Sequence, residues 1–191
     1  MTGEPDPYGV ALRVLQTLEA LGIAGTVGGS IASSFAGEPR STIDIDIVAA
    51  IEERHVRPIV AALTPEFYLD EDALRRAVLT RTSVNAIHQE TLLKVDLFVA
   101  GGTPLDALQL ARRQRVTVAD GRVLHVHPPE DIVLQKLRWY RLGGEASDRQ
   151  WRDLLAIVRV QGHRLDREYL RQHAPTLGVA DLLSRLLASA D

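Results

Sequence analysis

Two aspartates, Asp44 and Asp46, alternate with isoleucines over residues 43–47. Strict alternation of apolar and polar residues predicts a β-strand with one apolar face and one acidic face. Residues two apart on a strand point to the same side, with Cα atoms about 6.5–7 Å apart. Two carboxylates held together repel each other unless a cation lies between them, and hard oxygen ligands suit Mg²⁺ or Mn²⁺. The pair therefore suggests a divalent-metal site, although a solvated strand face has the same pattern.

A glycine turn precedes the acidic pair. Gly28, Gly29 and Ser30 follow the short apolar stretch 23–27 and lead into a helix expected over 30–35. Glycine lets a backbone approach a ligand closely, and the amides at a helix start attract anions. A plain strand-to-helix turn would look the same in isolation. A phosphate-binding turn and a metal site together suit a nucleoside triphosphate, because Mg²⁺ bridges its phosphates.

A third carboxylate, Asp96, stands among apolar residues on a central strand expected over 92–99. A carboxylate in such a strand needs a metal or a partner such as a neighbouring arginine. Lys94 lies two residues earlier and faces the same side. It could contact phosphate oxygens or neutralise Asp96, and both alternatives stay open. His125 and His127 also have a two-residue spacing, but no third ligand lies near them in the sequence.

In this order, the motifs resemble the signature of the DNA polymerase-β-type nucleotidyltransferase superfamily. The longer pattern is similar to the AbiEii-like, minimal-nucleotidyltransferase branch of that superfamily. It comprises Gly28-Gly29-x-x-Ala32 followed by Arg40-x-Thr42-x-Asp44-x-Asp46, whereas the later Asp96 belongs to the superfamily signature. The segments 129–137 and 148–154 are similar to the helical region of the same branch. The resemblance covers about residues 23–158.

The resemblance implies a metal-dependent nucleotidyltransferase that moves a nucleoside monophosphate, commonly AMP from ATP, to a hydroxyl acceptor and releases pyrophosphate. Asp44 and Asp46 would ligate Mg²⁺ or Mn²⁺. Asp96 would complete a second metal site and help to activate the acceptor hydroxyl. The Gly28–Ser30 turn would hold the β- and γ-phosphates.

Four further residues are expected on the nucleotide side. Thr42 could hydrogen-bond a phosphate or orient Asp44, and Arg40 could clamp the triphosphate, because its planar guanidinium fits phosphate. Lys94 and Lys136 complete the expected nucleotide-binding set, and they are the two lysines of the chain. Arg40 could equally be a surface arginine that closes a turn, and Lys136 a lysine on a helix surface.

The acceptor stays open among a tRNA end, a protein hydroxyl and a small molecule, because the superfamily uses all three and a fold does not choose among them. A second class of function is a weakly catalytic or non-catalytic interaction module of a toxin–antitoxin pair. Its partner would then be a cognate toxin or antitoxin protein.

Composition narrows the functional classes further. The chain has 191 residues, 22 basic and 25 acidic side chains, a net charge of −3 and no cysteine. This balance argues against a polyanion binder held by bulk charge, and the missing cysteines exclude a disulfide framework, a thiol nucleophile or a zinc–thiolate site. No apolar run approaches 18 residues and the start does not resemble a signal peptide. A soluble cytoplasmic protein without a membrane partner is expected.

The expected fold is α/β, with a mixed β-sheet flanked by helices and followed by a C-terminal helical region. Strands are predicted over 23–27, 43–48, 67–69, 83–88, 92–99, 116–118 and 123–126, and helices over 10–21, 30–35, 52–63 and 105–113. Helical spacing of apolar residues then dominates from the prolines at 128 and 129 onward. We therefore expect a nucleotidyltransferase-like core over 9–127 and a helical region over 128–191 that packs on it.

Overall fold

A computed structural model describes residues 6–38, 44–118 and 120–190. Contacts divide the described chain into two compact units. The first unit holds described residues of 1–31 and 42–127, and the second holds those of 32–41 and 128–191. In the described parts of the chain, no helix combines the length and apolar content that a bilayer crossing needs.

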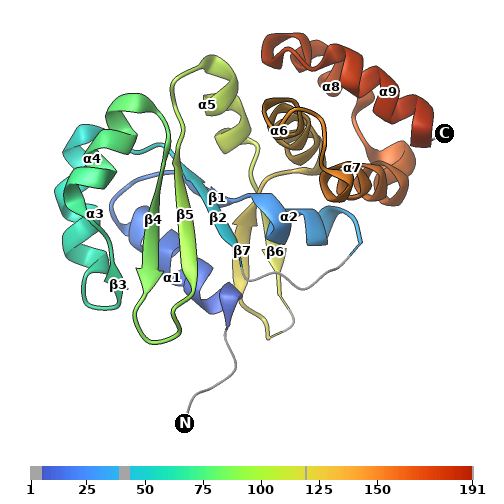
Figure 1. The fold of residues 1–191 in the computed structure, drawn as a ribbon. Coiled ribbons are helices and arrows are strands. Elements are labelled where there is room, and N and C mark those ends of the chain that lie inside the picture. Colours follow the sequence, from blue (N-terminus) through green and yellow to red (C-terminus); the bar gives the residue numbers. More distant parts are fainter. Residues whose placement is uncertain (1–5, 39–43, 119, 191) are drawn as a thin grey trace. The chain divides into compact units, whose positions relative to one another are not determined.

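The first unit is built on a seven-stranded mixed sheet with the strand order β3-β4-β5-β2-β1-β7-β6 (Figure 1). Strand β2 runs parallel to β5, and β1 runs parallel to β7, while the other neighbours are antiparallel. The strands are β1 Gly25–Val27, β2 Ile45–Ala49, β3 Phe67–Tyr68, β4 Ser83–His88, β5 Lys94–Val99, β6 Gln114–Thr117 and β7 Val123–Val126. The predicted mixed α/β fold is confirmed.

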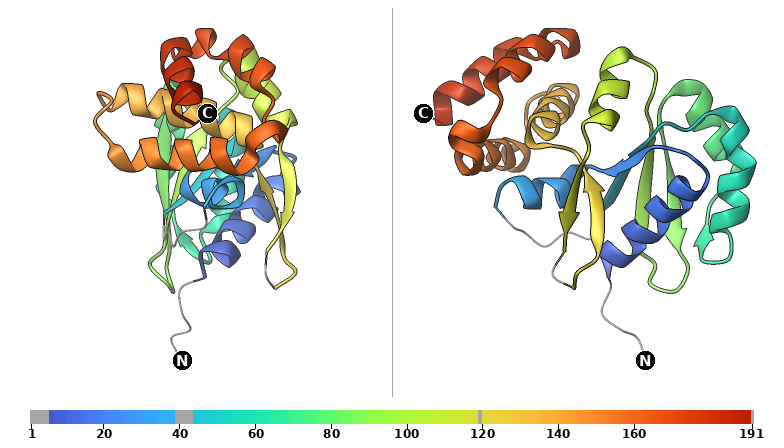
Figure 2. Two further views of the ribbon diagram at one scale, coloured as in Figure 1. Left: turned by 90° about the vertical axis from the view of Figure 1, so that its right-hand side faces the viewer. Right: turned by 180° about the vertical axis from the view of Figure 1, so that it is seen from behind.

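Helices of the first unit cover one face of this sheet. Helix α1 packs on β1, β2 and β7, and α4 packs on β4 and β5, with α3 between α1 and α4. Seen from behind, α1 crosses the sheet (Figure 2). The helices and the short 3-10 turn η1 are α1 Pro7–Ala20, η1 Glu53–His55, α3 Val56–Leu63, α4 Glu71–Thr80 and α5 Pro104–Ala111.

Alternation along β2 and β5 decides which side chains meet these helices. Ile45, Ile47, Val95 and Leu97 are fully buried, whereas the residues between them are half-buried or exposed on the opposite face. Burying four branched side chains stabilises the fold by roughly 1.5–3 kcal/mol each. The same alternation leaves the polar residues of both strands together on the other face.

Helix α4 is an element that the residue pattern did not predict. The Asp70 carboxylate caps its first turn by accepting a hydrogen bond from the Ala73 amide at 2.6 Å. Its buried residues are Leu74, Ala77 and Val78, which follow helical spacing over a single short stripe. Most of its other residues are charged or polar, and the apolar Leu79 is exposed, so the helical apolar pattern is weak in the sequence.

Helix α2 (Gly29–Ala36) starts in the first unit and continues into the second. The second unit also contains α6 Pro129–Leu142, α7 Asp148–Gln161, η2 Gly162–Arg164, α8 Arg167–His173, η3 Pro175–Leu177 and α9 Ala180–Ala190. Helix α6 packs on α7 and α8, and α9 packs on α7 and α8.

Aromatic and polar contacts join the helices of the second unit. The Arg185 guanidinium on α9 lies over the Trp151 ring of α7, 4.1 Å from its centroid, and Trp151 in turn packs on Tyr140 of α6. The Tyr169 hydroxyl on α8 donates a 2.7 Å hydrogen bond to the fully buried carboxylate of Asp131 on α6. These aromatic residues therefore serve helix packing.

Candidate active site

Two of the three predicted carboxylates face each other across neighbouring strands. In the parallel pairing of β2 and β5, Asp46 is the register partner of Asp96. Both lie on the sheet face opposite the buried aliphatic residues, because each alternates with them along its strand. The Asp96 side chain is 19% exposed, so it is partly shielded and still reachable by solvent.

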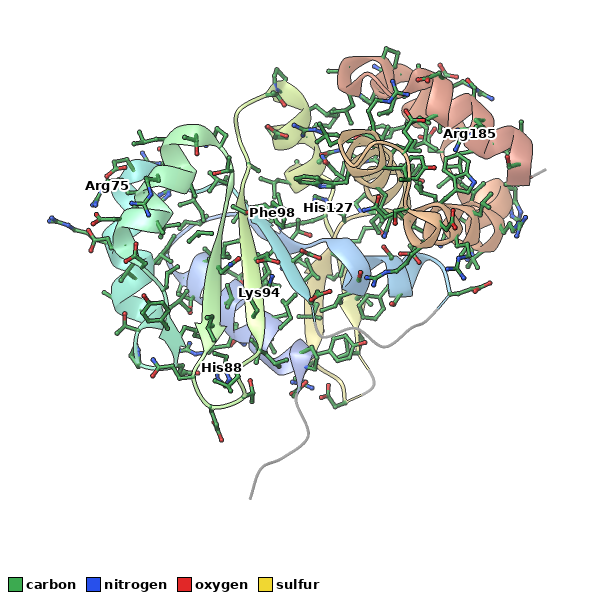
Figure 3. All side chains as sticks on the ribbon, viewed as in Figure 1. Arg75, His88, Lys94, Phe98, His127 and Arg185 are labelled. Carbon is green, nitrogen blue, oxygen red and sulfur yellow. The ribbon has the colours of Figure 1, made fainter. Side chains whose placement is uncertain are left out.

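Lys94 connects the carboxylates electrostatically. Its ammonium nitrogen Nζ lies 2.9 Å from Oδ2 of Asp96, and Figure 3 shows Lys94 on the same strand. The hydrogen bond to Asp96 and the charge of Asp96 raise the pKa of Lys94 above its usual range, and the charges of Asp44 and Asp46 add to this effect. All three predicted carboxylates thus act on one ammonium group, and the partner of Asp96 is a lysine rather than an arginine.

The glycine turn meets the acidic pair directly. Gly29 has a φ of +52°, and a Cβ placed on it would lie only 1.7 Å from Oδ2 of Asp46. The Gly28 amide donates a 2.9 Å hydrogen bond to the backbone carbonyl of Asp46. Glycine is therefore required at position 29 both by the backbone conformation and by the neighbouring carboxylate. Ser30 lies next to it in the first turn of α2 and is buried.

The donor set fits an open magnesium site rather than a closed cage. Among the described residues, no group of three or more histidine, aspartate or glutamate side chains is arranged to hold a metal ion by itself. Mg²⁺ is usually bound by one or two carboxylates together with water and substrate phosphates. Asp46 and Asp96 supply two such carboxylates beside the glycine turn. The three-carboxylate site, and with it the metal, stays a prediction.

The other predicted nucleotide-binding residues have different outcomes. Arg40 and Thr42 lie outside the described residues. Lys136 on α6 forms a 2.9 Å ion pair with Asp153 on α7, and only 12% of its side chain is exposed. Lys136 is therefore not an exposed lysine on a helix surface, because its ammonium group is largely shielded from solvent against a carboxylate within the second unit. Its role in nucleotide binding stays a prediction.

Asn85 also belongs to this face, although its sequence context did not mark it as a site residue. Asn85 on β4 is the register partner of Asp96, and the side chains of directly opposite residues share a face. A row of three polar side chains therefore runs across three strands, from Asn85 through Asp96 to Asp46. The alternation of polar and apolar residues at the start of 83–88 predicted that Asn85 points away from the core, but it could not predict which residue of the neighbouring strand Asn85 pairs with.

His127 is a second residue whose place was not foreseen. It follows β7, and its Cδ2 atom would lie 3.8 Å from a Cβ on Gly28. Only 4% of the residue is exposed, and its Nδ1 atom has no hydrogen-bond partner among the described residues. Burial lowers the pKa of His127 to about 4, so the ring is neutral at pH 7. A neutral imidazole therefore lies behind the glycine turn.

Comparison with solved structures identifies the fold. ANT(2'')-Ia in complex with adenylyl-2''-tobramycin matches with a TM-score of 0.57 at 12% identity, covering 88% of this chain and 96% of that one. The lincosamide antibiotic adenylyltransferase LnuA with lincomycin bound matches with a TM-score of 0.52 at 10% identity, covering 80% and 97%. A nucleotidyltransferase-like protein from Paracoccidioides brasiliensis matches with a TM-score of 0.54 at 18% identity, covering 91% and 90%.

No protein-family model matches the sequence, and no curated protein matches it. The AbiEii-like branch accordingly stays a prediction. The similar structures are nucleotidyltransferases or resemble them, and each is covered over most of its length. The chain therefore has the α/β fold of the nucleotidyltransferases.

Proposed function

We propose that the chain is a metal-dependent nucleotidyltransferase that transfers AMP from ATP to a hydroxyl acceptor and releases pyrophosphate. The observation that carries this proposal is the meeting of Asp46, Asp96 and Gly29 on one face of a nucleotidyltransferase-like sheet. The carboxylates suit a metal cation, and the backbone amides of the glycine turn suit the anionic triphosphate.

Each residue has a task in the proposed reaction. Asp46 and Asp96, with Asp44 beside them, would hold Mg²⁺, which stabilises the attacking and leaving oxygens of an in-line displacement when it is bound. The backbone of the Gly28–Ser30 turn would bind the β- and γ-phosphates. Asp96 would accept the proton of the acceptor hydroxyl while the hydroxyl oxygen attacks the α-phosphorus. The bond between the α-phosphorus and the departing pyrophosphate would then break. Arg40, Thr42 and Lys136 remain proposed contacts of the nucleotide.

Two of the similar structures are complexes with an antibiotic, one with adenylyl-2''-tobramycin and the other with lincomycin. This supports AMP as the transferred group and makes a small hydroxylated molecule the first acceptor to test. Protein hydroxyls and tRNA ends are the further acceptors in the same assay. The toxin–antitoxin alternative rests on the sequence resemblance alone and stays a prediction.

The test measures pyrophosphate release and the mass of the acceptor. The purified chain is incubated with each of the four nucleoside triphosphates, Mg²⁺ or Mn²⁺, and panels of aminoglycosides, lincosamides, tRNA and protein. Asp46→Asn and Asp96→Asn should each lower the rate by about a hundredfold or more, because each removes a carboxylate that would hold the metal, whose positive charge stabilises the reacting phosphate.

A matched control makes the same change outside the site. Asp72 lies on α4 with 78% of its side chain exposed, so Asp72→Asn should leave the transfer rate unchanged. The proposal fails if no triphosphate binds and no metal-dependent transfer occurs. It also fails if Asp46→Asn and Asp96→Asn transfer as fast as the unaltered chain.

A further inference from the structure

The ammonium group of Lys94 is a cation in direct contact with Asp96 at the site. Its Nζ atom is 2.9 Å from Asp96, and the charges of Asp44 and Asp46 act on it as well. One positive charge therefore offsets part of the repulsion among three carboxylates. The proposed metal would bind the same carboxylate of Asp96, whose Oδ2 atom Lys94 contacts.

The Lys94 side chain has room to leave this position. It is 47% exposed, at the start of β5, and its register partner on β4 is Ile87, an exposed apolar residue. A lysine has a flexible four-carbon stem and an ammonium group that binds oxygen atoms without a fixed geometry. Rotation about the bonds of this stem can therefore carry the ammonium group away from the carboxylate.

We propose that Lys94 is a resident counter-cation of the carboxylate cluster, which holds Asp96 until a metal–nucleotide complex enters and then moves to a phosphate oxygen. The proposal rests on the proposed nucleotidyl transfer. In this proposal, the two roles that the residue pattern left open for Lys94 follow one another: it first neutralises Asp96 and then contacts a phosphate oxygen. Its consequence is that free metal ions bind weakly, whereas metal and triphosphate bind together.

The direction of the effect follows from charge alone. A divalent ion that enters without nucleotide must either displace the ammonium group or share Asp96 with it, and the two cations repel each other. When a triphosphate is present, its oxygens give Lys94 a new anionic partner. The ammonium group can then leave Asp96 without losing its interaction with a negative charge. Removal of the lysine charge should therefore strengthen the binding of free metal and weaken the binding of the metal–nucleotide complex.

The experiment titrates Mn²⁺ into the full chain and follows free Mn²⁺ by electron paramagnetic resonance. It is done with Mn²⁺ alone and with Mn²⁺ plus a non-hydrolysable ATP analogue. Lys94→Gln should bind Mn²⁺ alone about tenfold more tightly than the unaltered chain, because the substitution removes the Coulomb repulsion between a single and a double positive charge in water. The same variant should bind the Mn²⁺–nucleotide complex more weakly, and Lys94→Arg should restore the original order.

A control variant removes one positive charge elsewhere. Arg57 on α3 is 83% exposed, and Arg57→Gln changes the net charge by the same amount, so it should bind Mn²⁺ like the unaltered chain. Circular dichroism and thermal unfolding verify that every variant is folded. Equal affinity of Lys94→Gln and the unaltered chain for Mn²⁺ alone would overturn the role of Lys94 and leave the proposed transfer intact. No binding of Mn²⁺ by either protein, with or without nucleotide, would overturn both.

Discussion

The substitution Gly29→Ala tests the contact between the glycine turn and the acidic strand. An alanine there has two separate costs. The backbone φ of +52° is left-handed, which costs a residue with a Cβ roughly 1–2 kcal/mol. The new methyl group would also lie 1.7 Å from Oδ2 and 2.5 Å from Cγ of Asp46, so the carboxylate has to move.

Two other glycines separate these costs. Gly22 has a φ of +72°, and a Cβ added there would have no atom within 4 Å, so Gly22→Ala measures the backbone cost alone. Gly28→Ala would place its Cβ 3.6 Å from Val48 and 3.8 Å from His127, which is ordinary packing without a left-handed φ. For a chain of this length, each kcal/mol lost lowers the melting temperature by about 2–4 °C. Gly22→Ala should therefore lower it by about 2–8 °C.

Activity then distinguishes Gly29→Ala from Gly22→Ala. Misplacing a reacting group by about 1 Å can lower a rate by about a hundredfold, and Asp46 has to move further than that to clear the methyl group. We expect Gly29→Ala to lower pyrophosphate release by about a hundredfold, while Gly22→Ala retains most of it at a temperature where both are folded. Calorimetry gives the stability and a coupled phosphate assay gives the rate. Equal rates for the two variants would refute the inferred contact.

Two further predictions concern buried charge. Between about pH 6.5 and about pH 4, His127 is protonated in the unfolded chain but stays neutral in the folded chain, where it is buried. The free energy of unfolding should therefore fall as the pH drops through this range. The expected loss, measured by urea unfolding, is about 3 kcal/mol. His127→Phe should remove this pH dependence of the free energy of unfolding, while His163→Phe, at an exposed position, should retain it. An unchanged pH dependence in His127→Phe contradicts the assignment. Lys136→Met should cost about 3–5 kcal/mol in the same measurement, because it removes the ammonium group that lies 2.9 Å from the largely shielded carboxylate of Asp153. Adding Asp153→Leu should restore most of that loss, and a double variant less stable than Lys136→Met would show that the pair is not the cause.

Local patterns in the sequence were enough to predict most strands and the direction in which their side chains point. Alternation over 43–48 placed Asp46 opposite the buried isoleucines of β2, and the same pattern placed Asp96 on β5. A strand repeats every two residues, so this information is contained in a few neighbouring positions. Helix α4 escaped prediction because its buried stripe is narrow and its other residues are mostly charged or polar, with the apolar Leu79 exposed.

Residue types and spacing, taken alone, placed Asp46 and Asp96 on strands and the glycine turn at a strand end of an α/β protein; the predicted strand position of Asp44 was wrong, because β2 begins at Ile45. Tertiary structure decided which of these residues touch: Asp46 lies opposite Asp96, and Gly29 lies against Asp46. The ion pairs of Lys94 with Asp96 and of Lys136 with Asp153 were decided at the same level. The physical reason is that strand order, register and helix packing depend on contacts between distant parts of the chain, whereas the periodicity of a sequence reports only on its immediate neighbours.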